Sequence, residues 1–498
     1  MKTEFLRWYK WSLLLGLTGF VVYARGIGID YYADDYQFVF DLSPHGVLYS
    51  FFHDNPHNSF YRPIQAAFLT IIQACFGLNT IPIHLTQIIM HVMLSLLVAI
   101  AVIKLGFSRI QAALGAIFML VSQANVHAVL SNDTFSQIGG TLFGCFSLWL
   151  LYLTYQSYGL SNTDSQIIKR KGYYLSIVML TVSYFSKETS ISFFPMLLGI
   201  IILANLRRHS CIFRKILIQI SPIILVTFFY LLVRSFVVTR QPAFGSSIYN
   251  FHLGINIIHN LGMFFFAATV PISSVTTYLA LNSGNISTFL IVLVATVFVV
   301  SLIVSGLWFS RKHSRIIFSL GAFAIFGLFP TFMLNHVSEL YVYTSMPFIS
   351  AIIGIGLGKF LKSSKTHRIT YITILSIISL LFLSHYLSIQ TKAMLMKERG
   401  ERSSMILSQI EPYVEKVPEN GKLLLVNQPS NEIEYSVFIM RGFNVLRNGL
   451  HRINEISGRY DFTTYIVDRP EIAVNHSVSN QCCLSLTLSI DGKVVQVD

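Results

Sequence analysis

The sequence predicts an all-α polytopic membrane protein of about eleven transmembrane helices, followed by a small C-terminal soluble α/β or α+β domain. Of its 498 residues, 53% are hydrophobic and only 12% are charged, whereas about a quarter of an ordinary soluble domain is charged. The apolar residues form repeated runs of about 20, the length of helix that crosses a bilayer. After Ser388 the composition changes to charged residues and short strand-like stretches, which predicts a separate soluble domain.

The first transmembrane helix is expected over residues 11–23, after a basic flank that contains Lys2, Arg7 and Lys10. Because basic flanks stay on the cytoplasmic side, the N-terminus is predicted to be cytoplasmic and the loop at residues 29–83 extracytoplasmic. The end of this run is also compatible with cleavage of a secretory signal. The following loop is expected outside whether or not cleavage occurs.

The ten further spans are expected near residues 84–103, 109–128, 137–157, 173–188, 190–205, 216–235, 286–309, 316–334, 341–360 and 369–389. With the first helix running outward, each predicted inside loop contains Lys or Arg, for example Arg170, Arg207 and Arg311. This distribution follows the positive-inside rule. It accounts for the formal net charge of +13 without a nucleic-acid partner, because the sequence has no basic helix with interleaved aromatic residues.

Residues 251–281 are apolar enough to span, but they contain His259, Asn260 and Pro271. If this run crossed the membrane, every later loop would change side and the basic loops would lie outside. We therefore predict an interfacial or re-entrant segment, which irregular backbone tolerates where it is buried in protein or faces a cavity.

The chain is predicted to divide into a transmembrane domain, residues 1–389, and a soluble extracytoplasmic domain, residues 390–498. The second domain begins with a charged helix that includes Lys392 and continues with strand-like stretches at Leu423–Val426 and Leu484–Ser489. The five cysteines show no metal-ligand spacing. Neither a zinc site nor a disulfide framework is therefore expected.

Two adjacent carboxylates follow the first predicted helix. Asp34 and Asp35 belong to the extracytoplasmic loop and lie close to the membrane surface. Crowding of like charges and a low dielectric raise the pKa of one carboxylate toward neutrality, so such a pair can supply a general base and its partner. Solvated loops contain such pairs as well, and the pair alone does not decide between these interpretations.

Charged residues from distant segments are predicted to lie on the same membrane face as this loop. They are Lys187, Glu188, Arg234, Arg240 and Glu339. Any one of them is explained by a helix-end charge whose side chain reaches the interface. Together, at one depth, they indicate a binding or catalytic site, or a water-filled transport vestibule.

Two histidines lie on one face of the second predicted span. His84 and His91 are two helical turns apart. A buried, hydrogen-bonded histidine is the more common explanation of such a residue, and contact with a substrate is the alternative. A metal site would need further ligands that the sequence does not place.

Several of these residues belong to motifs that resemble those of a known family. The motifs are Asp34-Asp35-Tyr36, Tyr61-Arg62-Pro63-Ile64, Phe76-Gly77-Leu78-Asn79, His84-Leu85-Thr86 with His91, Phe118 to Val129, Ser186-Lys187-Glu188 and Glu339-Leu340-Tyr341-Val342-Tyr343. They are similar to segments of GT-C-type glycosyltransferases, in particular the membrane part of the mannosyltransferase-like branch with tetratricopeptide tails. The resemblance covers roughly residues 30–350.

The sequence departs from the family pattern in the second and third predicted spans and in the C-terminal tail. Gln87 stands where Asn is usual, and Ser122-Gln123 stands where His-Pro is usual. In the third predicted span, Asn125 and His127 occupy positions at which a His and a Glu are usual. Residues 390–498 also lack the repeat of about 34 residues that a tetratricopeptide tail would show.

The resemblance implies a hexosyltransferase that moves a sugar from a polyprenyl-phosphate-linked donor to a lipid, glycan or protein acceptor. The reaction would take place on the extracytoplasmic face, in the cell membrane of a bacterium or the endoplasmic reticulum of a eukaryote. The resemblance implies that Asp35, or Asp34, takes the proton of the acceptor hydroxyl. The departing phosphate needs cations, and the available ones are Arg62, Lys187, Arg234 and Arg240, of which Arg62 and Lys187 are favoured because the family motifs contain them. The other expected substrate-binding residues are Glu188, His84, Glu339 and Tyr341.

Two other functions are compatible with the sequence. A transporter or flippase of a polar lipid would also need a wet, charged cavity. It predicts charges near the bilayer midplane and related halves of the chain, whereas here the strongest charges are predicted at the outer face and no internal repeat is evident. A non-catalytic assembly factor with the same fold is the other alternative. The sequence indicates no cofactor with certainty. The two carboxylates offer oxygen ligands to a divalent cation, although nothing in their spacing demands one.

Overall fold

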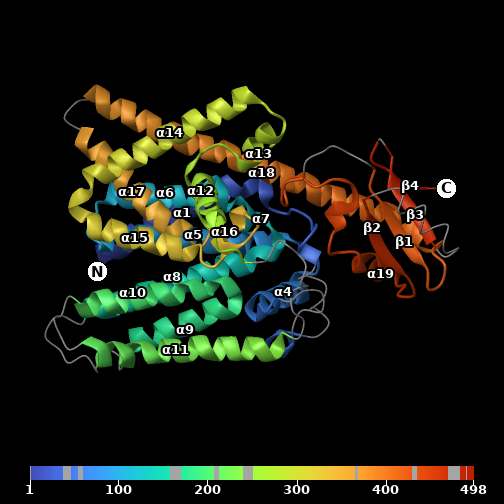
Figure 1. Ribbon diagram of the computed structural model, residues 1–498, viewed down its shortest axis with the longest axis horizontal. Helices are drawn as coiled ribbons and strands as arrows, with labels where there is room; N and C mark the ends of the chain where they lie inside the picture. The colour runs from blue at the N-terminus through green and yellow to red at the C-terminus, as the bar shows by residue number, and fades with distance from the viewer. Residues whose placement is uncertain are drawn as a thin grey trace.

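The computed structural model describes residues 2–36, 46–53, 60–157, 170–206, 212–238, 251–364, 368–428, 434–468, 483–489 and 491–497. Figure 1 shows a large bundle of helices with a small sheet beside one end of it. The N-terminus lies at the end of the bundle away from the sheet (Figure 1).

The long helices of the bundle are α1 (Lys2–Tyr23), α5 (Ile81–Lys104), α6 (Arg109–Val121), α8 (Phe135–Ser157), α9 (Lys171–Ser186), α10 (Phe193–Leu206), α11 (Ile212–Val237), α14 (Ile286–Phe309), α15 (Ser314–Gly327), α17 (Met346–Ser363) and α18 (Arg368–Val414). Between them in the sequence lie α3 (Tyr49–Phe52), α4 (Pro63–Phe76), α7 (Val126–Leu130), α12 (Ile255–Thr269), α13 (Ser274–Asn282) and α16 (Glu339–Val342).

Glycines allow helices α6 and α17 to approach each other closely. A Cβ added to Gly354 of α17 would lie 2.3 Å from the backbone nitrogen of Gly115 on α6.

Seven helices of the described chain are long and apolar enough to cross a membrane, or eight if α6 and α7, which meet at a bend of 44°, form one span. The predicted count of about eleven is therefore not confirmed, although a helix is present at each expected position. Helices α9 and α15, of 16 and 14 residues, are shorter than the roughly 20 residues that a full crossing needs. Helix α1 carries polar and basic residues in its first half.

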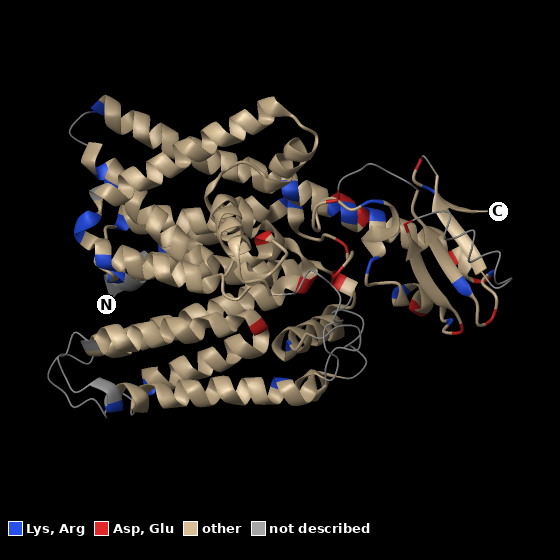
Figure 2. Cartoon of the chain, in the orientation of Figure 1, with Lys and Arg blue, Asp and Glu red and all other residues tan. Residues whose placement is uncertain are grey.

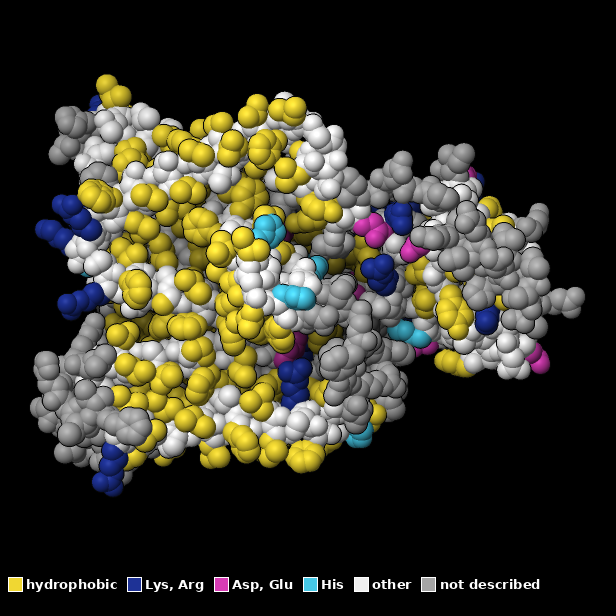
Figure 3. All heavy atoms as spheres, in the orientation of Figure 1, with side chains coloured by type: hydrophobic (Ala, Val, Ile, Leu, Met, Phe, Trp, Pro, Cys, Tyr) yellow, Lys and Arg dark blue, Asp and Glu magenta, His cyan; other side chains and the backbone are white. Residues whose placement is uncertain are grey.

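The surface of the bundle is apolar. Large hydrophobic side chains such as Leu225, Phe236 and Val294 are each at least 67% exposed, and Figure 3 shows hydrophobic side chains over most of the visible face of the bundle. Water would solvate such a surface poorly, whereas lipid tails solvate it well. Together with the apolar helices, this surface identifies an integral, multi-pass membrane protein.

The charged residues are divided between the two ends of the bundle. Figure 2 shows a group of Lys and Arg residues at the end away from the sheet, while the described Asp and Glu residues of the bundle, together with further Lys and Arg residues, lie nearer the sheet. The loops and helix ends that the sequence predicts to be cytoplasmic contain Lys104, Arg311 and Lys362.

Residues 251–281 form two short helices. Helix α12 has 15 residues and α13 has nine, and neither is long enough to cross a bilayer. The backbone before α12 pairs with a later loop through the isolated bridge between Phe251 and Leu334. The side-chain amide of Asn260 donates hydrogen bonds to the backbone carbonyls of Phe332 and Leu334. This arrangement suits a re-entrant segment, which stays a prediction.

Helix α18 connects the bundle to the sheet. It has 47 residues and runs through the predicted domain boundary at residues 389 and 390. The sheet has the order β2-β1-β3-β4, with strands β1 (Lys422–Val426), β2 (Thr463–Val467), β3 (Cys483–Leu488) and β4 (Val494–Gln496). Strand β1 runs parallel to β2 and β3, and β4 is antiparallel to β3. The two strands expected from the sequence are thus confirmed.

Candidate active site

The first loop is fixed between the bundle and the C-terminal part of the chain. Gly400 of α18 packs on this loop, since an added Cβ would lie 2.8 Å from the carbonyl oxygen of Asp30. The backbone N–H of Ala33 donates a 2.7 Å hydrogen bond to the carbonyl of Val445, which precedes α19 (His451–Ser457). Ala33 has a φ of 50°, an unusual conformation for a residue with a side chain. These contacts hold residues 30–33 of the loop in one conformation.

Asp35 is buried, with 1% of its surface exposed. Its Oδ2 accepts hydrogen bonds of 3.1 Å from the backbone N–H of Tyr32 and from the side-chain amide of Asn132. Its Oδ1 accepts hydrogen bonds from the backbone N–H of Asp133 at 3.1 Å and from the Ser131 hydroxyl at 3.3 Å. Burial first, and the nearby charge of Asp133 second, raise the pKa of Asp35 to about 8.

Asp133 is a second acidic residue at this site, and sequence reasoning missed it. It lies in a short turn, Asn132–Thr134, which joins α7 to α8. Its Oδ1 accepts a 2.8 Å hydrogen bond from the Ser131 hydroxyl, and the Gln65 side chain donates to its backbone carbonyl. An acidic residue directly after the third predicted span was the available signal. The family pattern has its acidic residue within that span, where this chain has Asn125 and His127.

Asp34 lies beside Asp35 but faces another part of the chain. Its Oδ1 accepts a 2.6 Å hydrogen bond from the side-chain amide of Asn448, and its side chain is exposed. The two carboxylates of the predicted pair therefore have different surroundings. Asp35 meets the α7–α8 turn with Asp133, whereas Asp34 meets the C-terminal part of the chain.

Arg62, Lys187 and Glu188 meet at the corner after α9. The Nε and Nη2 of Arg62 donate hydrogen bonds of 2.9 and 2.6 Å to the two carboxylate oxygens of Glu188, which makes a bidentate ion pair. The side chain of Lys187 has no ion pair or hydrogen bond to another part of the described chain, although the residue is only 3% exposed. This buried ammonium group is therefore suited to an anionic ligand.

The other two predicted cations differ in what the structure shows of them. Arg234, in the last turn of α11, is half-buried and close enough to Glu188 to act on it electrostatically. Arg240 lies outside the residues that the structure describes.

A second buried ion pair joins α16 to α18. The Lys392 Nζ lies 2.6 Å from Oε2 of Glu339, and it also donates to the side chain and backbone carbonyls of Gln123. Lys392 was expected on a charged helix of the soluble domain, but it is fully buried. That expectation was wrong because α18 packs on the bundle at this point. The other carboxylate oxygen, Oε1 of Glu339, is buried and has no hydrogen-bond partner among the described residues.

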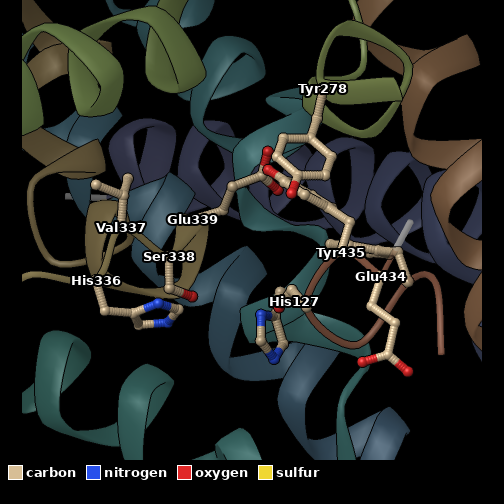
Figure 4. Close-up of a pocket in the computed structure, with 10 residues that line it drawn as sticks. His127, Tyr278, His336, Val337, Ser338, Glu339, Glu434 and Tyr435 are labelled. Carbon is tan, nitrogen blue, oxygen red and sulfur yellow. The ribbon is translucent and has the colours of Figure 1, made fainter. Parts of the chain in front are cut away.

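A pocket of about 260 Å³ lies beside Glu339. It is lined by residues of α7, α13, α16, the loop before α16 and the segment 434–438. The charged, imidazole and tyrosine side chains among them are those of His127, Tyr278, His336, Glu339, Glu434 and Tyr435 (Figure 4), and Ser338, Ser436 and Phe438 line it as well. His127 lies near both ion-pair regions, since Asp133, Lys187 and Lys392 all act on it electrostatically. The pocket is therefore adjacent to the charged residues described above.

Two further predicted residues are engaged in packing. His84 accepts a hydrogen bond from the backbone N–H of Gly28 at Nδ1, and its Nε2 lies 3.1 Å from the carbonyl oxygen of Leu130. Both nitrogens of this buried ring are occupied, so His84 positions the first loop on α5. Tyr341 packs edge-on against His336, with 6.2 Å between ring centroids.

No group of three or more His, Cys, Asp or Glu side chains in the described ranges is arranged to hold a metal ion. Asp35 and Asp133 together offer carboxylate oxygens, but the oxygens of Asp35 already accept four hydrogen bonds. A divalent cation would therefore need ligands besides these two residues.

The chain resembles known proteins in its architecture. No family model and no curated protein matches the sequence. Among solved structures, ArnT from Cupriavidus metallidurans in the apo state is similar, with a TM-score of 0.55, 11% identity, and 96% of this chain and 93% of that chain covered. ArnT bound to undecaprenyl phosphate gives a TM-score of 0.51 and 11% identity, over 97% of this chain and 93% of that chain.

An archaeal protein shares the architecture as well. The oligosaccharyltransferase of Archaeoglobus fulgidus, in the apo form, has a TM-score of 0.50 and 10% identity, over 91% of this chain and 64% of that chain. At such low identity these likenesses establish architecture alone. The predicted tetratricopeptide-tailed branch is not confirmed. The polypeptide has a GT-C fold.

Proposed function

We propose that the protein is a membrane glycosyltransferase that moves a hexose from a polyprenyl-phosphate-linked donor to an acceptor hydroxyl on the extracytoplasmic face. The convergence of two carboxylates, Asp35 and Asp133, with Lys187 and Arg62 carries this proposal. These residues come from three separate loops and meet near one end of the bundle. ArnT, which shares the fold, binds undecaprenyl phosphate in its crystal structure, and this supports a lipid-linked donor.

In the proposed reaction, Asp35 is the general base. The Ser131 hydroxyl makes the longest of the four hydrogen bonds to Asp35, at 3.3 Å, and is also bonded to Asp133 at 2.8 Å. An acceptor hydroxyl can take its place at Oδ1 of Asp35. The acceptor proton passes to this oxygen while the acceptor oxygen forms a bond to the anomeric carbon of the donor.

The bond between the anomeric carbon and the phosphate oxygen breaks in the same step. The bonding electrons stay with the phosphate, which leaves on the polyprenol and gains negative charge. Lys187, a buried cation without an ion-pair partner in the described chain, stabilises that charge, and Arg62 adds its guanidinium while it keeps Glu188 in place. A lipid-linked phosphate reaches these groups while its tail stays in the bilayer.

The proposed orientation rests on the distribution of basic residues. The end of the bundle away from the site carries Lys and Arg (Figure 2), and basic loops face the cytoplasm. The site and the C-terminal sheet then lie on the extracytoplasmic side.

The proposal is tested by transfer of radiolabelled sugar from a panel of polyprenyl-phosphate donors into membrane extracts. Purified wild type should transfer label from at least one donor. The Asp35→Asn protein should lose activity by about 10²–10⁴-fold, the usual contribution of a general base. Asp491→Asn is the matched control, because this carboxylate is 60% exposed on the C-terminal sheet. Full activity of a correctly inserted Asp35→Asn protein would exclude Asp35 as the base.

A further inference from the structure

The pocket beside Glu339 contains two buried polar atoms that the described chain leaves unpaired. One is Oε1 of Glu339, and the other is Nδ1 of His127. Both residues line the pocket and are only 7% exposed. A buried polar atom without a partner costs free energy, which a ligand recovers when it supplies the missing hydrogen bond. The pocket thus suits hydroxyl groups, which donate to a carboxylate oxygen and pair with either tautomer of an imidazole nitrogen.

The charge balance of the pocket favours a neutral ligand. Lys392 neutralises Glu339 through the 2.6 Å ion pair. The Glu434 carboxylate is balanced by the Arg441 guanidinium, whose Nε lies 3.9 Å from Oε1 of Glu434, and it accepts hydrogen bonds from the backbone N–H of Arg441 and from the side chain of Asn444. An ammonium group or a phosphate would therefore meet no unbalanced opposite charge among these residues. A hydroxyl group needs none, and it donates a charge-assisted hydrogen bond to Oε1 of Glu339.

Aromatic rings form another wall of the pocket. The rings of Tyr278 and Tyr435 lie 4.7 Å apart, and Phe438 follows at 6.3 Å from Tyr435. Figure 4 shows the Glu339 carboxylate close to the two tyrosines, with the imidazoles of His127 and His336 below them in this view. A carboxylate beside aromatic faces matches a molecule that has both hydroxyl groups and apolar C–H faces, as a sugar ring does.

The size of the pocket limits what can enter. Its volume of about 260 Å³ lies just below the roughly 300–1,000 Å³ of sites for drug-sized ligands. A single sugar ring suits this volume, whereas an extended peptide or a long oligosaccharide does not.

We propose that this pocket binds one uncharged saccharide ring, with Glu339 and His127 bonded to its hydroxyls and Tyr435 packed on its face. The inference rests on the proposed transferase function and names the chemistry that the site recognises. The ring belongs either to the acceptor or to the donor sugar. Ser131 connects this pocket to the proposed general base. Its backbone N–H donates to the carbonyl of His127 in α7, and its hydroxyl donates to Asp35.

Binding is measured first, on the full-length protein in detergent, by saturation-transfer NMR. The probes are the methyl glycosides of mannose, glucose and galactose, with ethanolamine and inorganic phosphate as the charged comparisons. At least one methyl glycoside should bind wild type and lose about 5–10-fold in affinity in Tyr435→Ala, the effect of about one lost contact. Tyr435→Ala leaves the Glu339–Lys392 pair intact. Tyr460→Ala, at a tyrosine that is 75% exposed, should bind as wild type does.

The proposal is overturned if folded wild type binds none of the glycosides, or if Tyr435→Ala binds them equally well. It is also overturned if ethanolamine or phosphate binds and is the probe that Tyr435→Ala weakens. Glycoside binding without sugar transfer from any donor would refute the transferase and leave the saccharide pocket standing.

Transfer kinetics then identify the source of the ring. If the ring is that of the acceptor, Tyr435→Ala raises the KM for a glycan acceptor and leaves the KM for the donor unchanged. If the ring is the donor sugar, the donor KM rises instead. Inhibition by the bare polyprenyl phosphate should be unchanged in both cases, because its phosphate is assigned to Lys187. No change in either KM would contradict the pocket's part in the reaction.

Discussion

The site contains two buried ion pairs, and a different kind of unpaired polar group lies at each of them. The Arg62–Glu188 pair is bidentate and its side chains are 9% and 16% exposed, while the ammonium group of Lys187, which has no bonded partner in the described chain, lies next to it. The Lys392–Glu339 pair is monodentate and its side chains are 0% and 5% exposed, and it leaves one carboxylate oxygen without a partner among the described residues. The first region thus suits an anion and the second suits hydroxyl donors.

The largest difference between the pairs is expected in stability. Lys392→Met leaves the Glu339 carboxylate buried and uncompensated, which should lower the free energy of unfolding by about 3–5 kcal/mol. Arg62→Met should cost less, because Glu188 is more exposed and Lys187 lies beside it. Denaturant unfolding in detergent measures both. Combining Lys392→Met with Glu339→Met should restore most of the stability. Equal losses of stability in Lys392→Met and Arg62→Met would contradict the expected difference between the two ion pairs.

Lys187 gives the Arg62–Glu188 region its proposed role, which is to stabilise the charge of the leaving phosphate. Lys187→Gln should reduce kcat by about 10²–10³-fold, the usual effect of losing one donor that stabilises transition-state charge. Its fold should be retained, because the side chain makes no ion pair in the described structure. The control is Lys397→Gln, at a lysine that is 52% exposed on α18. Activity within twofold of the control would show that the phosphate charge is stabilised elsewhere.

Replacing Arg62 by lysine is expected to change activity less than replacing Lys187. Arg62→Lys keeps the positive charge but loses the planar fork that bonds both oxygens of Glu188. Loss of one charge-assisted hydrogen bond corresponds to roughly a tenfold change, which should appear in the KM for the donor. Steady-state kinetics at varied donor concentration measure it. An unchanged donor KM would mean that Arg62 acts only as a structural partner of Glu188.

The smallest effect is a shift in pH dependence. Asp35 acts as a base only when deprotonated, so with its pKa raised to about 8, kcat/KM should rise about tenfold per pH unit at acidic pH. Burial lowers the pKa of Lys187 to about 7, so loss of this positive charge should reverse the rise at alkaline pH. Asp133→Asn removes one of the two causes that raise the pKa of Asp35, so the rise should move to lower pH. A rise that moves to higher pH, or does not move, would contradict the assigned role of Asp133.

Much of the helical framework was predictable because a bilayer imposes a length on apolar runs. The predicted positions coincide with helices, but the number of full spans does not, since α9 and α15 are shorter than their apolar surroundings suggested. The sheet strands at 423–426 and 484–488 were predictable from local apolar stretches.

The site was predictable only where local motifs marked it. Arg62 and Glu188 were each named from the sequence, but their pairing joins residues 126 positions apart. Lys392 was expected only as part of a charged helix of the soluble domain, because nothing local shows that α18 packs it against Gln123. Asp133 follows a span in which the family's acidic residue is missing, and only the packing of the α7–α8 turn on Asp35 reveals it.

The most direct test is an experimental structure of the protein bound to undecaprenyl phosphate. The account predicts a phosphate oxygen about 2.8 Å from the Nζ of Lys187, the distance of a charge-assisted hydrogen bond, with Arg62 alongside and the Glu339 pocket free of phosphate. A phosphate bound beside Glu339, or at the basic end of the bundle with Lys187 unliganded, would contradict it.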